Sequence, residues 1–338
     1  MKEFNKFVLN LQYFNNTNVT TAAVTGNDLS TEMKTFYSDY LIDNARPLLV
    51  HDQFGQKHPI PKNGGKTIEF RKYSPFAKAL TPITEGVTPN GHKLNVTNLT
   101  ATVAQYGDYV ELSDVLLLTA VDNNLVEATK LCGNQAGETL DTVTREVLVG
   151  GTNAMYSGGV SDRSLLKAGN KLTVDDCFRA ARFLKTNKAQ KIDGYYVAII
   201  HPDVAYDLMR SEDWVNAAQY AGSTQVFEGE IGKVAGIRFV ETTEAKIFAG
   251  QSGDDKDVYV TLVLGANAYG VTEVEGGGLQ HIVKQLGSAG TADPLNQRAT
   301  VGWKAIKTAE RLVEGYMVRI ESCSTFDSGS AELAGGIE

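Results

Sequence analysis

The chain has 338 residues, 42% of them hydrophobic, and carries a formal net charge of −8 with an isoelectric point near 5.3. This acidity argues against a protein that grips nucleic acid over a wide surface, because such surfaces are basic. No stretch of about 20 apolar residues occurs, so the sequence predicts no membrane-spanning helix. The cysteines are far apart and odd in number, which predicts small buried groups rather than a disulfide framework: Cys132, Cys177 and Cys323.

Residues 1–61 are predicted to form an N-terminal arm. Up to residue 45 they mix Asn and Thr with isolated apolar residues, a pattern too polar to bury a core of its own. A short helix is expected within "STEMKTFYSDYLIDNARPLL", ending before Pro47. We therefore expect the arm to rest on another surface.

Residues 62–113 are predicted to form an extended hairpin loop. "KTIEFRKY" (66–73) alternates in polarity, and the β-branched segment 93–114 is its expected long partner. The tip between them carries apolar side chains that a lone hairpin cannot bury: Phe76, Leu80, Ile83 and Val87. The tip is either a disordered surface loop or a segment that docks on a neighbouring subunit, with Phe76, Leu80 and Ile83 as contact residues.

A long helix is predicted next, within residues 115–150. Apolar residues recur at spacings of three or four: Leu125, Ala128, Cys132, Ala136, Leu140, Val143 and Val147. The glycines that follow, Gly150 and Gly151, end it. The stripe extends over more residues than an average α-helix contains.

From Thr173 onward, helices mix with strands, which predicts an α+β fold. Thr173 and Asp176 resemble a capping box for a helix whose buried face holds Val174, Phe178, Ala181 and Leu184. Pro202 occupies the first position of a second helix. Buried strands are expected at 195–200, 234–242 and 258–265.

The C-terminal third is predicted to be rich in strands, above all in "DPLNQRATVGWKAIKTAERLVEGYMVRIE" (293–321). One strand places Val301, Trp303 and Ala305 on the same face, and the next does so for Tyr316, Val318 and Ile320. We expect Trp303 to pack inward on the long helix, and we count it among the assembly contacts.

Five basic residues accompany these strands: Arg298, Lys304, Lys307, Arg311 and Arg319. They form either a nucleic-acid patch or, as we favour, a solvated face or salt bridges between subunits. On the second interpretation Arg298, Lys304 and Arg319 are assembly contacts.

Catalytic signatures are weak throughout. "NGGKT" (63–67) lacks the earlier glycine of a phosphate loop, since position 60 is Ile, and it leads into a strand instead of a helix. The histidines include no pair at helical metal spacing, and His201 with Asp203 resembles a helix start more than a base and its orienting group. We predict that the chain is not an enzyme and binds no cofactor or metal.

The order of these elements resembles the major capsid proteins of tailed bacteriophages, which have the Hong Kong 97-type fold. "NLQYF" (10–14) is similar to the opening of many phage coat proteins. "HPDVAYDL" and "FEGEIGKVAGIRFVET" are similar to an axial-domain segment, and 293–321 is similar to the C-terminal region of the same family.

The resemblance implies an α+β fold with an N-terminal arm, an extended β-hairpin loop, a long spine helix and an α/β axial domain. Residues 114–154 and 281–326 correspond to a peripheral domain with the spine helix, 155–280 to the axial domain, and 327–338 to a C-terminal tail.

The resemblance also implies a viral structural protein of the virion, which self-assembles through pentamers and hexamers into an icosahedral capsid around double-stranded DNA. A portal and, because the arm is short and uncharged, a separate scaffold are expected partners. We expect no cleavage of this chain, no membrane contact, no sequence-specific DNA contact, and assembly in the bacterial host cytoplasm. Two alternatives stay open: an encapsulin-like nanocompartment shell, and an α+β enzyme with an unrecognised site.

Overall fold

The computed structural model describes residues 49–73, 76–83, 85–86, 88, 91–119, 124–215, 232–288 and 293–327. The predicted arm up to residue 48, with its helix and "NLQYF", lies outside the described residues, as does the tail from residue 328. The described residues form two compact units. The small unit holds residues 107–134 and 280–304, and the large unit holds residues 49–106, 135–279 and 305–327.

The large unit contains a seven-stranded mixed sheet with the strand order β5-β14-β10-β6-β8-β7, and β9 pairs with β10. Its strands are β5 (Ala154–Tyr156), β6 (Tyr196–Ile200), β7 (Lys233–Val234), β8 (Ile237–Glu241), β9 (Ile247–Phe248), β10 (Val258–Leu264) and β14 (Met317–Ser322). The central strands β6 and β10 are buried along their whole length because both faces of the sheet are covered. The strands predicted at 195–200 and 258–265 are confirmed, whereas 234–242 is divided, because Ala235 and Gly236 have positive φ and turn the chain between β7 and β8.

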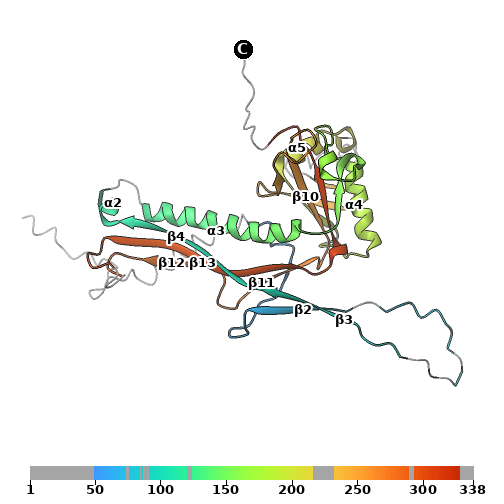
Figure 1. Ribbon diagram of the computed structural model, residues 1–338, viewed down its shortest axis with the longest axis horizontal. Helices are drawn as coiled ribbons and strands as arrows, with labels where there is room; N and C mark the ends of the chain where they lie inside the picture. Colours follow the sequence, from blue (N-terminus) through green and yellow to red (C-terminus); the bar gives the residue numbers. More distant parts are fainter. Residues whose placement is uncertain are drawn as a thin grey trace, which may run out of the picture. The chain divides into compact units, whose positions relative to one another are not determined.

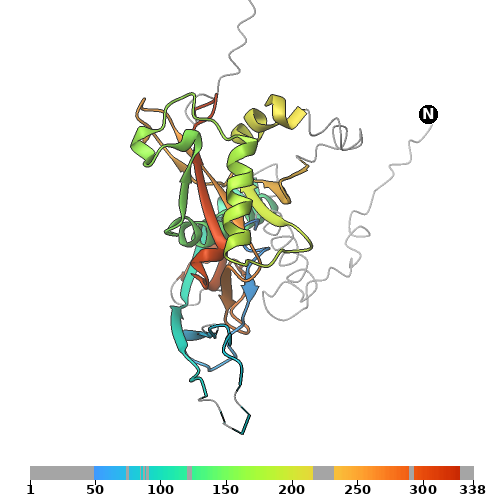
Figure 2. The same cartoon turned by 90° about the vertical axis from the view of Figure 1, so that its right-hand side faces the viewer.

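Two helices cover one face of this sheet, α4 (Val174–Thr186) and α5 (Pro202–Met209). Figure 2 shows α4, in yellow-green, lying across the sheet that contains β14, in red. The predicted capping box is present, since the Thr173 hydroxyl accepts a hydrogen bond from the Asp176 N–H at 3.2 Å. Short 3-10 helices connect the strands: η3 (Ser157–Gly159), η4 (Arg163–Leu165) and η6 (Glu314–Tyr316).

Phe178 does not lie on the buried face of α4, as predicted, and is 55% exposed. The buried face instead contains Val174, Cys177, Ala180, Ala181 and Leu184. Phe178 follows Cys177 by one residue, which turns it about 100° around the helix and away from the sheet.

The opposite face of the seven-stranded sheet packs on the C-terminal end of α3 (Asn124–Val149) and on β11 (Tyr269–Glu273). Leu148 of α3, Tyr269 of β11 and Leu262 of β10 belong to one buried cluster. β11 pairs in parallel with β1 (Gln56–Lys57) and antiparallel with the second half of β13 (Arg298–Arg311). The sheet therefore lies between two layers, with α4 and α5 on one side and α3 and β11 on the other.

The predicted hairpin is formed by β2 (Thr67–Tyr73) and β3 (Val96–Thr102), which pair antiparallel over seven residues (Figure 1). Phe70 attaches its base to the large unit. Its ring meets the ring of His58 edge-on, with centroids 5.5 Å apart. A Cβ on Gly270 would lie 3.0 Å from the Phe70 ring, so glycine there lets the ring pack close to β11.

The partner strand predicted at 93–114 is not one continuous strand. It ends as β3, and after Val103 the chain continues as β4 (Ala104–Ser113), which pairs with β13. The two halves pair with different partners, β3 with β2 and β4 with β13, so the segment passes from one sheet to another at Val103.

In the small unit, the first half of β13 pairs antiparallel with β12 (Gln280–Lys284). β4 also pairs with β13, and both strands use glycine where they meet. A Cβ on Gly302 would lie 2.7 Å from the Tyr109 Cβ, and one on Gly107 would lie 2.6 Å from the Trp303 carbonyl oxygen. Side chains at these two positions would push the strands apart.

The predicted long helix is divided into α2 (Asp114–Thr119) and α3, with residues 120–123 outside the described part. The predicted stripe of α3 is confirmed at its centre, where four residues are buried: Ala128, Cys132, Ala136 and Leu140. The Cys132 Sγ lies 3.9 Å from the Val301 carbonyl oxygen, so β13 follows the helix (Figure 1). Among the described helices, none is both long and apolar enough to cross a membrane.

Candidate functional site: assembly surfaces and a buried polar cluster

The tip of the β2–β3 hairpin presents large apolar side chains to solvent. Leu80 is 81% exposed, Ile83 76%, Leu94 67% and Phe76 56%. Val87 lies outside the described residues. Clustered exposed apolar side chains mark interaction surfaces in soluble proteins. Phe76, Leu80 and Ile83 are exposed in the single chain, and their docking on a neighbouring subunit stays a prediction.

A second exposed apolar set lies in α2, where the sequence analysis predicted no surface. None of the residues of α2, "DVLLLT", is buried. Val115 is 62% exposed and Leu118 is 83% exposed. The sequence contained a sign of this exposed set. Four consecutive apolar residues cannot all face the same side of one short helix, so some of them must be exposed.

Trp303 is buried, as predicted, with 3% of its surface exposed, and its packing on the long helix and its place among the assembly contacts stay predictions. The basic residues around it serve two different purposes. Arg298, at the start of β13, is exposed and lies 4.0 Å from the Glu111 carboxylate, and Lys304 is half-buried. These two side chains remain candidates for contact with a neighbouring copy.

The other basic residues bind within the chain and do not form a solvated face, and the role of Arg319 as an assembly contact stays a prediction. Arg311 donates to the Val147 carbonyl at 2.8 Å and to Glu314 at 2.6 Å. Arg319 donates to the carbonyls of Val149 and Gly151, the latter at 3.2 Å. Both arginines thus bind the C-terminal end of α3, where the last carbonyls lack helical partners and the helix dipole favours cations.

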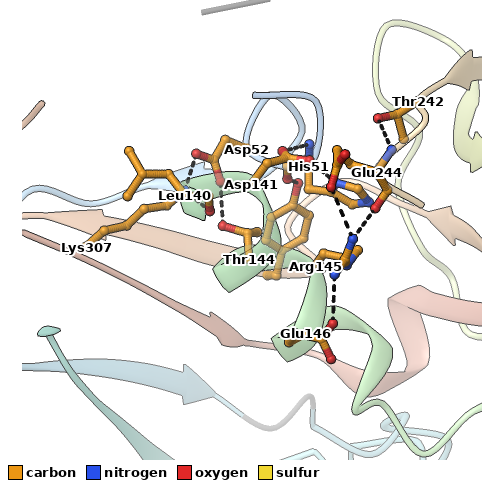
Figure 3. Close-up of polar contacts among 11 residues, drawn as sticks. His51, Asp52, Leu140, Asp141, Thr144, Arg145, Glu146, Thr242, Glu244 and Lys307 are labelled. Carbon is orange, nitrogen blue, oxygen red and sulfur yellow. Dashed lines mark hydrogen bonds and ion pairs between the residues drawn. The ribbon is translucent and has the colours of Figure 1, made fainter. Parts of the chain in front are cut away.

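Lys307 contradicts the solvated-face interpretation most clearly, because its side chain is only 2% exposed. Its ammonium pairs with Asp52 and donates to the Leu140 carbonyl at 2.9 Å (Figure 3). Thr144 donates to the same carboxylate at 2.6 Å. A buried lysine requires such partners, since an unpaired charge in the interior is very costly.

His51 and Asp141 form a second buried pair beside the first (Figure 3). The His51 Nδ1 lies 2.6 Å from Oδ2 of Asp141, and the backbone N–H of His51 donates to Oδ1 at 2.7 Å. The Tyr269 hydroxyl donates to the His51 carbonyl, and burial raises the pKa of that phenol. Together the two pairs fix residues 51–52 on α3 and β13.

No sequence pattern predicted this cluster. Asp141 and Thr144 lie on α3 directly beside the apolar stripe, and both are fully buried. The sequence did show two polar residues beside the buried stripe, which is a sign of a buried polar contact. It could not show their partners, because those come from distant parts of the chain. His51 is 90 residues away from Asp141, and Lys307 is 255 residues away from Asp52.

The weak catalytic candidates have structural roles. The His201 Nδ1 accepts the Asp203 N–H at 3.2 Å and so caps α5. Burial lowers the pKa of His201, which favours the neutral ring that this capping needs. "NGGKT" leads into β2, as expected, and all three cysteines are buried. Among the described residues no group of three metal-binding side chains gathers.

The chain matches a family of known proteins. A family model described as phage capsid protein matches residues 97–309. No curated protein matches the chain.

Solved structures resemble the chain over most of its length. The capsid of cyanophage Pam1 gives a TM-score of 0.67 at 14% identity, over 92% of this chain and 98% of that one. The capsid of cyanophage P-SCSP1u gives 0.63 at 15% identity, over 82% and 88%. A virus-like particle from Pyrococcus furiosus gives 0.51 at 11% identity, over 86% and 100%. At these identities the likeness shows a shared fold.

Proposed function

The chain belongs to the phage capsid protein family, and from this premise we propose how its copies build and fill a phage head. It is a structural coat protein, a major capsid protein of the virion, whose copies associate into a shell. Its fold is the α+β, Hong Kong 97-type fold that the sequence predicted.

The proposed shell is icosahedral, is built from pentamers and hexamers, and encloses double-stranded DNA without sequence-specific contact. Separate scaffold and portal proteins assist its assembly in the cytoplasm of the bacterial host. The chain's role is geometric and not catalytic. Its net charge of −8 supports weak contact with the packaged DNA, since phosphates repel an acidic wall.

The observation that carries this proposal is the exposure of Phe76, Leu80 and Ile83 on a two-stranded hairpin. An isolated hairpin is marginally stable in water, and ordering each residue costs about 1–2 kcal/mol. Apolar burial against another copy returns about 25 cal/mol for each Å² removed from water. Repeated in every subunit, individually weak contacts give a stable closed shell.

The domain division follows the same proposal: arm 1–61, hairpin loop 62–113, peripheral domain 114–154 and 281–326, axial domain 155–280, and tail 327–338. The compact units divide the described chain at residues 106/107, 134/135, 279/280 and 304/305, and of these 279/280 lies next to a proposed boundary. The other three positions lie within β4, α3 and β13, so each of these elements belongs partly to one unit and partly to the other. The proposed domains describe roles in a shell, whereas the units describe packing within one chain.

The nanocompartment alternative shares the fold, because a virus-like particle from Pyrococcus furiosus is among the similar structures. The matched family model favours the phage head over it. Scaffold, portal and terminase genes beside the gene for this chain would support the head, and their absence would support the compartment. The enzyme alternative has no supporting site among the described residues.

Expression of the chain, alone and with its gene neighbours, tests the proposal. We expect closed shells in negative-stain images and particles far larger than the 36.6 kDa chain in light scattering. A single species of subunit mass under both conditions, at high protein concentration, would refute the proposal.

A further inference from the structure

The end of α4 and the segment that follows it carry a concentration of positive charge. Residues 182–191, "RFLKTNKAQK", contain four basic residues and no acidic one, in a chain whose net charge is −8. All four basic side chains are exposed: Arg182, Lys185, Lys188 and Lys191. Asp193 is the one acidic residue between Cys177 and Pro202. This part of the large unit is therefore opposite in charge to the chain as a whole.

The β7–β8 hairpin extends this positive surface. Lys233 and Arg238 are both exposed and lie directly opposite each other in the register of the two strands. The Lys233 ammonium lies 4.5 Å from the centre of the Tyr195 ring. A Cβ on Gly236, in the turn, would lie 3.9 Å from the Lys191 Nζ. Six basic residues thus form one surface, here called the basic strip: Arg182, Lys185, Lys188, Lys191, Lys233 and Arg238.

The charges of the basic strip are not neutralised by the chain itself. In the part of the chain that the structure describes, none of the six forms an ion pair with a carboxylate. Other basic residues of the large unit do form such pairs: Lys171 with Asp207, Lys246 with Glu146 at 2.8 Å, and Arg163 with Glu321 at 2.6 Å. Like charges gathered without counter-charges repel one another, so the strip favours a negatively charged partner.

Stabilisation of α4 explains only one of the six residues. A cation near the last carbonyls of a helix interacts favourably with the helix dipole, and Lys185 lies in the last turn of α4. Arg182 precedes that turn, and the other four residues lie beyond the end of the helix. Five charges therefore need another explanation.

The composition of the strip favours phosphates over a protein surface as its partner. Four of the six residues are lysines, which are depleted in protein–protein interfaces, whereas both Lys and Arg bind phosphate groups. The strip spreads over a helix, a loop and a hairpin, so it presents a row of separate charges. Double-stranded DNA presents a matching row, with one negative charge for about every 1.7 Å of its axis.

We propose that the basic strip is where the shell contacts the packaged double-stranded DNA, through its phosphates and without reading its sequence. This inference rests on the proposed phage head and identifies the residues that face the DNA. The rest of the acidic chain repels phosphates, so the contact of each copy is weak. Its repetition in every copy holds the DNA against the wall.

Salt-dependent binding of DNA tests the proposal. The probe is a short, fluorescein-labelled duplex of random sequence, titrated with unassembled subunits at several salt concentrations. We expect the logarithm of the association constant to fall linearly with the logarithm of the salt concentration, because bound phosphates release counterions. A variant that combines Lys185→Gln, Lys188→Gln and Lys191→Gln should have a slope smaller by about 2–3, since each lost phosphate contact removes about 0.9.

A matched control removes the same charge outside the strip. It combines Lys57→Gln, Lys62→Gln and Lys66→Gln, at three exposed lysines that also belong to the large unit. The slope should stay almost unchanged in this variant, and the circular dichroism of both variants should remain native. Equal losses of slope in the two variants would show that only the net charge matters, and would overturn the proposal.

Acetylation of lysines in assembled heads is a second measurement. Heads with and without packaged DNA are treated with a small acetylating reagent, and mass spectrometry compares each lysine between them. We expect Lys185, Lys188 and Lys191 to be acetylated severalfold less in the filled heads, because phosphates cover them. Lys57 should be acetylated equally in both.

Each outcome decides between the readings. Equal acetylation of the strip in filled and empty heads, or an unchanged slope in the strip variant, would overturn the DNA contact and leave the proposed function intact. If the strip variant formed no shells while the unmodified chain did, the strip would serve a protein contact, which also overturns the proposal. Failure of the unmodified chain to form any shell would instead refute the proposed function.

Discussion

His51 and Asp141 form a buried pair in which the His51 Nδ1 lies 2.6 Å from the Asp141 Oδ2 and both side chains are at most 1% exposed. Asp141 also accepts the backbone N–H of His51 at 2.7 Å. One carboxylate thus holds both the side chain and the main chain of the first described segment of the large unit.

Asp141→Ala is expected to lower the free energy of unfolding by about 3–5 kcal/mol, because it leaves a buried ring and a buried N–H without an acceptor. Denaturant unfolding of the unassembled chain measures this. Glu146→Ala is the control, since that carboxylate is 45% exposed and its pairs with Arg145 and Lys246 should contribute no more than about 1 kcal/mol. In a double-mutant cycle, His51→Ala should cost much less once Asp141 is absent, and additive losses would contradict the pairing.

Gly302→Ala is expected to destabilise the small unit by about 1–3 kcal/mol or more, because the new Cβ would overlap β4. It would lie 2.7 Å from the Tyr109 Cβ and 2.8 Å from the Asp108 carbonyl oxygen. Gly278→Ala is the control, since its Cβ would meet nothing closer than 3.6 Å. Equal unfolding curves for the two variants would show that β4 and β13 are not held this closely.

Trp303→Asp is expected to abolish shells and to leave little folded chain. The indole is 3% exposed, so the variant buries a charge in its place, at a cost comparable to the whole stability of a domain, about 5–15 kcal/mol. Trp303→Phe should still assemble. Soluble yield and negative-stain images measure both variants, and abundant shells of normal size from Trp303→Asp would count against the inward packing.

The native cysteines are expected to resist alkylation in the folded chain. Burial, and next the nearby Asp176, raise the pKa of Cys177 to about 12, and burial is the main cause that raises the pKa of Cys323 to about 11. At about pH 8 both are therefore protonated and unreactive, whereas an unfolded thiol with a pKa of about 8.5 reacts. Mass spectrometry should show no native modification and three modified cysteines in denaturant. Ile83→Cys provides the reactive control, and rapid labelling of Cys177 in a natively folded sample would contradict its burial.

Asp207 is expected to contribute stability that disappears in acid. It accepts hydrogen bonds from the Ser324 hydroxyl and the Thr325 N–H, both at 2.8 Å, and it lies 3.2 Å from the Lys171 ammonium. Burial alone would raise the pKa of Asp207, but these contacts outweigh it and lower the pKa. Because the folded pKa lies below the unfolded value of about 3.9, the contribution is complete above that value and is lost as the pH falls through the folded pKa.

Asp207→Asn should therefore be less stable than the unmodified chain at neutral pH, by about 1–2 kcal/mol, and the difference should shrink below about pH 4. Unfolding curves recorded from neutral to acid pH measure this. Asp175→Asn is the control, since that side chain is 67% exposed and should show almost no effect. A stability difference between Asp207→Asn and the unmodified chain that grows as the pH falls would contradict this prediction.

Local patterns in the sequence were sufficient for most of the secondary structure. The capping box of Thr173 and Asp176 depends on residues three positions apart, and the buried stripe through Cys132, Ala136 and Leu140 depends on one helical period. The alternation around Trp303 identified the inward face of β13. Exposure of the hairpin tip followed from the same reasoning, because two strands cannot bury its apolar residues.

Which distant residues and strands contact each other was decided only by the tertiary structure. Lys307 resembled a surface charge until Asp52, 255 residues away, was placed beside it. The segment 93–114 resembled one strand until its second half was found on β13. Periodicity reports whether one side chain of an element faces inward or outward. Which distant side chain meets it depends on how whole elements pack, and that arrangement is set by all their contacts together.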